Sequence, residues 1–138
     1  MPANTQPIFS RVSDVQWLTV ALTSANTAKD GTGTVGSIFT ADVTNGGFVQ
    51  KIVARSLGTN VATVLRVFAN NGAANSTASN NAMIAELTLP ATTLSEIAAQ
   101  PDYVLPINIA LPPGYKINCA IGTAVAAGYM ISAVGGKY

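Results

Sequence analysis

Histidine is absent from the sequence, and charged residues are scarce. Without histidine the chain lacks the most common general base, the most common metal ligand and the centre of every Ser-His-Asp triad. Only 9% of the 138 residues are charged, against about 25% in a typical soluble domain. The net charge of +1 provides no basic stripe that would hold nucleic acid. We therefore expect a protein that is not an enzyme and that has no catalytic residue, cofactor, metal ion or nucleic-acid partner.

The few charged residues are spread along the chain rather than clustered. The acids stand singly at Asp14, Asp30, Asp42, Glu86, Glu96 and Asp102. Asp30-Gly31-Thr32-Gly33 lacks the repeated acidic ligands and the closing glutamate of a calcium loop. Arg55 and Arg66 lie on neighbouring predicted strands, and Lys51 lies on the same face as Arg55. These residues form either a small basic patch for an acidic partner or solvated strand faces that discourage edge pairing. We favour the second interpretation.

Cysteine and aromatic residues are also rare. The one cysteine, Cys119, excludes an internal disulfide and a cysteine metal cluster. With Tyr115, Ile117 and Ile121 it lies on one face of an alternating run, which predicts a buried structural thiol. The one tryptophan, Trp17, stands near the first predicted strand, and we interpret it as a core residue.

No hydrophobic run is long enough to cross a bilayer. The most apolar window, residues 119–134, is interrupted by Gly122, Thr123, Gly128 and Ser132. Residues 1–7 lack the basic region and apolar core of a signal peptide. We expect a soluble chain that is made in the cytosol and has no membrane partner.

Apolar residues, which make up 49% of the chain, recur mainly with a period of two. This period predicts β-strands, which we place at residues 15–22, 35–43, 48–56, 61–70, 83–89, 104–111, 115–121 and 128–134. About eight short strands with Gly-, Asn- and Pro-rich connections predict an all-β antiparallel sandwich. We favour a jelly roll, and a seven-stranded immunoglobulin-like sandwich is the alternative. The predicted core comprises Leu18, Val20, Ile52, Leu65, Val67, Leu87, Ile109, Ile117 and Ile131.

The connections between these strands carry recognisable turn signals. Asn45-Gly46-Gly47 predicts a type I′ hairpin, and Pro112-Pro113-Gly114 predicts a tight reversal. Residues 25–34 and 70–81 read as long polar loops. Residues 93–100 predict one short helix, with Thr93 and Glu96 as a capping box.

Residues 1–14 differ from the rest and predict an extended N-terminal arm, followed by a single sandwich domain at residues 15–138. Pro2 and Pro7 disfavour a helix or a central strand in this arm. Ile8, Phe9 and Val12 are apolar and have no obvious local core. We therefore predict that Pro7, Ile8, Phe9 and Val12 bind a partner. The alternative is that Ile8 and Phe9 pack on their own sandwich as a short edge strand.

Half of the chain is Thr, Ser, Asn, Gly or Ala, which gives a neutral surface suited to packing against other protein. Three segments add to this pattern: Ala110-Leu111-Pro112-Pro113-Gly114-Tyr115, Gly122-Thr123-Ala124, and the last six residues, Ala133-Val134-Gly135-Gly136-Lys137-Tyr138. In these segments and in its strand layout the chain resembles small head-associated structural proteins of tailed bacteriophages.

The resemblance implies a capsid decoration, or cement, protein with a sandwich or jelly-roll fold. Such a protein is made in the host cytoplasm and lies on the capsid exterior of the virion, commonly as a trimer. The implied partners are the major capsid protein of the same virus and further copies of the chain. Two alternatives remain open: a component of the phage tail, baseplate or fibre, and a carbohydrate-binding β-sandwich module.

Overall fold

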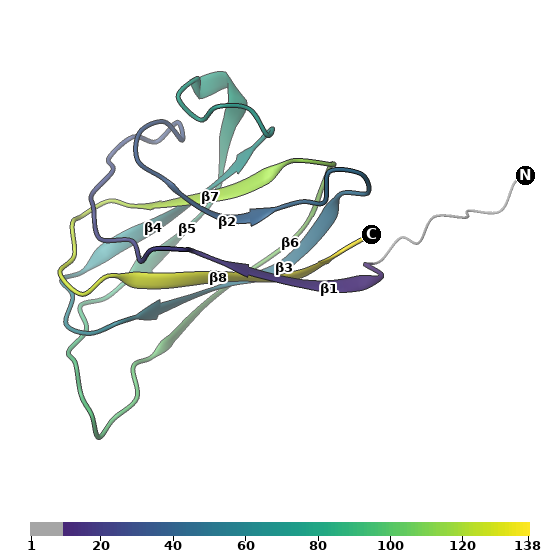
Figure 1. Cartoon of the computed structure of the whole chain (residues 1–138). Coiled ribbons are helices and arrows are strands. Elements are labelled where there is room, and N and C mark those ends of the chain that lie inside the picture. Colours follow the sequence, from purple (N-terminus) through teal and green to yellow (C-terminus); the bar gives the residue numbers. More distant parts are fainter. Residues whose placement is uncertain (1–9) are drawn as a thin grey trace, which may run out of the picture.

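The computed structural model describes residues 10–138 as a sandwich of two β-sheets (Figure 1). Its strands are β1 (Val12–Trp17), β2 (Gly36–Thr40), β3 (Gly47–Ser56), β4 (Thr63–Asn70), β5 (Asn81–Leu89), β6 (Asp102–Leu111), β7 (Lys116–Ile121) and β8 (Tyr129–Lys137). A short 3-10 helix, η1 (Ala78–Asn80), precedes β5. Within these residues, no helix has the length and apolar content required to cross a bilayer.

Each sheet has four antiparallel strands. Sheet A has the order β1-β8-β3-β6, and sheet B has the order β2-β7-β4-β5. Strands therefore pair as first with last, second with seventh, third with sixth and fourth with fifth. The predicted all-β sandwich of eight antiparallel strands is confirmed, and this nested pairing is consistent with a jelly roll.

The core lies between the sheets and contains most of the residues that the period of two placed there. Leu18, Ile52, Leu65, Val67, Ile117 and Ile131 are buried, and Leu87 and Ile109 are partly buried against them. Cys119 is also buried as predicted, and desolvation raises the pKa of its thiol. The prediction that Val20 belongs to the core is wrong, because β1 ends at Trp17 and the chain then becomes irregular. Leu18 and Leu22 enter the core there, whereas Val20 is 76% exposed.

The predicted helix at residues 93–100 is absent. The chain there forms an irregular loop between β5 and β6 that projects from one end of the sandwich (Figure 1). The Ser95 hydroxyl accepts hydrogen bonds from the backbone N–H groups of Ile97 and Ala98. Leu94 and Ile97, the apolar pair of the predicted helix, are 56% and 98% exposed. Without a surface to bury that pair, the short segment gains no tertiary stabilisation as a helix.

The Asn45-Gly46-Gly47 turn was predicted as a hairpin, and this is wrong because β2 and β3 lie in different sheets. The segment crosses the end of the sandwich instead. The carboxylate of Asp42 accepts hydrogen bonds from the N–H groups of Thr44 and Asn45. Gly46 has a positive φ of 79°, whereas Asn45 does not share it. The Pro112-Pro113-Gly114 reversal is confirmed by a hydrogen bond from the Tyr115 N–H to the Pro112 carbonyl.

Candidate protein-binding face

The outer face of sheet A presents apolar side chains where a solvated sheet normally presents polar ones. Directly paired residues of an antiparallel sheet share a face, so the register places them. Gln16 pairs with the buried Ala133 and therefore points inward. Val15 pairs with Val134 and Trp17 pairs with Ser132, and these residues point outward.

The register extends this outward set across the whole sheet. One row runs Trp17–Ser132–Val53–Val104, and the next runs Val15–Val134–Lys51–Pro106. We define the outer apolar patch as Val15, Trp17, Val53, Val104 and Val134. Val53 and Val134 are half-buried in the middle of the sheet, whereas Val15, Trp17 and Val104 are 49%, 62% and 45% exposed. Contiguous exposed apolar patches of this kind mark binding sites more often than isolated apolar residues do.

Trp17 corrects the prediction that this residue belongs to the core. The pairing with Ser132 places the indole on the outward side of β1, beside a side chain too small to cover it. The residue type predicted burial, because tryptophan is usually buried. The register overrides that preference, and the indole becomes the largest exposed group of the outer apolar patch.

Gln16 fixes the strand that carries Trp17. Its side-chain Nε2 donates to the Thr40 carbonyl, and its Oε1 accepts from the Thr40 N–H, both at 2.9 Å. These bonds join β1 at the edge of sheet A to β2 at the edge of sheet B. The two residues are 24 positions apart, so the sequence carries no local signal for this contact.

The described strands of sheet A carry one ion pair and one separate lysine on this face. Arg55 and Asp102 pair directly across β3 and β6 and form a salt bridge at the margin of the patch. Lys51 lies nearer the centre, next to Val134. Arg66 lies on sheet B, where its Nε is 3.0 Å from Oε1 of Glu86. The three basic residues therefore do not form one patch. The interpretation that we favoured is also wrong for Arg66, because its side chain is only 13% exposed and both β3 and β4 are central strands.

Of the predicted partner-binding residues, Pro7, Ile8 and Phe9 lie outside the described residues. Val12 is described and is 52% exposed, opposite Lys137 at the start of β1. Val12 lies on the same face of β1 as Gln16, opposite the face of Trp17, so it is not part of the outer apolar patch. The last three residues of the expected arm, 12–14, belong to β1, because they pair with the end of β8.

Two of the described carboxylates, Asp30 and Asp42, have local roles in turns. The Thr32 hydroxyl and N–H bind the carboxylate of Asp30 and lower its pKa. The N–H groups of Asn45 and Thr44 do the same for Asp42. Within residues 10–138, no three His, Cys, Asp or Glu side chains come together as a potential metal site.

Comparisons of the chain with family models, with curated proteins and with solved structures found no match. The functional argument therefore rests on the outer apolar patch and on the pattern of the sequence.

Proposed function

We propose that this chain is a non-enzymatic structural protein of a virus particle, a decoration protein that binds and stabilises the outer surface of a phage capsid. The observation that carries the proposal is the outer apolar patch, held on a rigid sandwich with a charge-poor surface. Such a patch favours association with other protein. The resemblance to head-associated phage proteins supplies the particle on which this association occurs.

The occupant that we assign to the outer apolar patch is a second copy of the chain. Aromatic and branched apolar side chains, here Trp17 among valines, are typical centres of protein interfaces. The ion pair of Arg55 and Asp102 neutralises the margin of the face, and a net charge of +1 produces little repulsion between copies. Head-to-tail contact, in which the patch of one copy packs on a different surface of the next copy, would close into the homotrimer that the resemblance implies.

Attachment to the capsid is assigned to Pro7, Ile8 and Phe9, with Val12 at the base of the segment. Ser10 lies beside Gly136 near the end of β8, so the described part of the chain begins at one end of sheet A. A trimer presents three such segments to the major capsid protein. Three linked contacts bind far more tightly than one, because the second and third are intramolecular.

A carbohydrate-binding module is the alternative that the exposed Trp17 favours, since an indole face stacks on sugars. A sugar also requires several hydrogen-bonding groups around the ring. In the outward row that contains Trp17, only Ser132 supplies one from its side chain, since Val53 and Val104 supply none. A tail, baseplate or fibre component would use the same apolar contacts at another place in the virion.

Cosedimentation with separated phage particles tests the proposal. We expect the purified chain to pellet with empty capsids of the phage that encodes it, and to remain in the supernatant with isolated tails. Binding to tails alone would move the protein to the alternative location. Calorimetric binding to glycans without capsid binding would overturn the structural role.

A further inference from the structure

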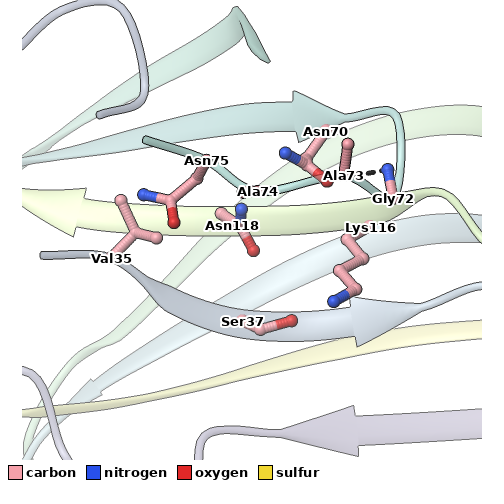
Figure 2. A pocket seen from close by; sticks show the side chains of 9 residues that line it. All are labelled: Val35, Ser37, Asn70, Gly72, Ala73, Ala74, Asn75, Lys116 and Asn118. Carbon is pink, nitrogen blue, oxygen red and sulfur yellow. Dashed lines mark hydrogen bonds between the residues drawn. The ribbon is translucent and has the colours of Figure 1, made fainter. Parts of the chain in front are cut away.

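A second surface, on the opposite side of the sandwich from the outer apolar patch, contains a polar pocket. Its volume is about 300 Å³, at the lower end of the range for small-molecule sites. The floor is formed by Ser37 of β2 and by Lys116 and Asn118 of β7 (Figure 2). The loop after β4, including Asn75, forms one wall.

The strand register brings the floor residues together. Ser37 pairs directly with Asn118 across β2 and β7. Directly paired residues have Cβ atoms about 5 Å apart. Lys116 precedes Asn118 by two positions, so both side chains project from the same face of β7. Figure 2 shows Asn118 between Asn75 and Lys116 in this view.

The wall of the pocket is fixed by asparagine side chains. Nδ2 of Asn75 donates to the carbonyls of Gly31 and Gly33, at 3.1 and 2.9 Å. Oδ1 of Asn70 accepts from the Gly72 N–H at 2.7 Å. The predicted polar loop at residues 70–81 is therefore anchored to the loop at residues 25–34, and the pocket is formed before any ligand arrives.

Asn118 is the floor residue whose side-chain amide takes no part in the hydrogen bonds of the described fold. It is only 5% exposed, and its side-chain amide has no hydrogen-bond partner among the described residues. Its amide atoms still reach solvent in the pocket, because among the described residues only Nη1 of Arg66 is a fully buried side-chain polar atom without a partner. The amide is therefore free to bind a ligand in place of water. The ammonium group of Lys116 and the hydroxyl of Ser37 also lack partners among residues 10–138. Three donors thus face one cavity.

We propose that this pocket binds a carboxylate group. Lys116 supplies the opposite charge, and the amide of Asn118 and the hydroxyl of Ser37 supply hydrogen bonds. The residues around the cavity include no acid to repel the ligand and no aromatic ring to stack on a neutral sugar. One lysine balances the single charge of a carboxylate, whereas phosphate would retain uncompensated charge. The carboxylate belongs to a free small acid or to an acidic side chain of another protein.

This proposal is independent of the proposed function, because the pocket and the outer apolar patch lie on different sheets. Its test is an NMR titration of the labelled full-length chain with sodium acetate, with sodium chloride at matched ionic strength as the blank. We expect saturable shifts of the Asn118 side-chain amide in acetate and none in chloride. Substitution of the cation in Lys116→Met should weaken acetate binding about tenfold or more.

Lys29→Met is the matched control, because Lys29 is an exposed lysine outside the pocket. Its acetate affinity should equal that of the wild type. Equal affinity of Lys116→Met and wild type, or absence of a saturable shift, would overturn the proposal. Tighter binding of inorganic phosphate than of acetate would overturn the assignment to carboxylate.

A blocked peptide with one glutamate distinguishes the two sources of the group. Tighter binding of the peptide than of acetate supports a side chain of another protein, and the reverse order supports a free acid. Asn118→Leu provides a second readout that does not depend on the choice of ligand. It should lose acetate binding with little change in the melting temperature, since the amide makes no hydrogen bond to the described residues. A large fall in melting temperature would indicate that Asn118 has a structural role instead.

Discussion

Gln16 and Thr40 exchange two hydrogen bonds of 2.9 Å that join the edge strands of the two sheets. Backbone groups at a sheet edge normally face water or another chain. Here one amide side chain satisfies both the N–H and the carbonyl of Thr40. The contact lies on the inward side of β1, and the next residue, Trp17, lies on the outward side that carries the outer apolar patch.

Replacement of Gln16 by alanine should destabilise the sandwich. Both Thr40 backbone groups lose their partner, which we expect to lower the free energy of unfolding by about 1–3 kcal/mol. Urea unfolding followed by circular dichroism measures the change. Gln50→Ala is the control, because Gln50 is exposed on β3 and has no side-chain hydrogen bond among the described residues. Equal stabilities for the two variants would show that the Gln16–Thr40 hydrogen bonds contribute nothing to the stability of the sandwich.

Replacement of Trp17 by serine should separate association from folding. Trp17 is 62% exposed, so we expect the unfolding free energy of the isolated chain to change by only about 0.5 kcal/mol. Association should weaken by about 2 kcal/mol or more, as for a buried aromatic at an interface centre. Light scattering should report a trimer for the wild type and smaller species for Trp17→Ser. Ile97→Ser, at an exposed loop position outside the patch, should remain trimeric.

A wild-type chain that is monomeric at tens of micromolar, with no concentration dependence, would contradict this assignment of the patch. A Trp17→Ser trimer of unchanged stability would move the interface to another surface.

Removal of residues 2–9 should weaken attachment to the capsid. The truncation leaves all of β1 in place, whereas a deletion through residue 13 would remove the first two residues of that strand. We expect the sandwich to fold and the capsid affinity to fall by roughly 2 kcal/mol or more, because burial of Phe9 and Ile8 contributes about 1.5–3 kcal/mol each. Binding isotherms with empty capsids measure the loss. Unchanged affinity would direct attention to the loop at residues 70–81.

Stability should decrease in acid, in part through Asp42. Backbone N–H groups of Asn45 and Thr44 hold the pKa of this carboxyl below its ordinary value of 3.8. A folded-state pKa below the unfolded one stabilises the protein above the unfolded pKa. That contribution is lost as the pH falls through the folded-state pKa.

We expect the urea concentration at the midpoint of unfolding to decrease as the pH is lowered from 5 through the pKa of Asp42. The decrease should be smaller for Asp42→Asn than for the wild type. The amide oxygen of asparagine still accepts hydrogen bonds but does not titrate in this range. An identical acid profile for Asp42→Asn would show that Asp42 does not contribute to the pH dependence.

Much of the core followed from the period of two, because residues such as Ile52, Leu65 and Ile131 lie in regular strands with one face inward. The prediction failed where the backbone leaves that period. Val20 lies beyond the end of β1, and the register shift near Phe39 buries both Ile38 and Phe39. The exposed position of Trp17 follows from its pairing with Ser132, which the residue type does not encode.

The candidate sites were harder to predict than the core. The outer apolar patch draws on four strands that are distant in the sequence, and its members look like ordinary strand residues. The pocket at Asn118 also depends on pairing, with Ser37 across β2 and β7. The alternation around Cys119 did indicate which β7 residues face the core, and two of the remaining residues, Lys116 and Asn118, line the pocket.

The capsid-binding isotherm of the wild-type chain tests the account most directly. Purified protein is mixed with empty capsids over a range of concentrations, pelleted and quantified. We predict saturable binding that both Trp17→Ser and the truncation of residues 2–9 weaken, while Ile97→Ser binds as the wild type does. Failure of the wild-type protein to pellet with capsids at any concentration would contradict the proposed function.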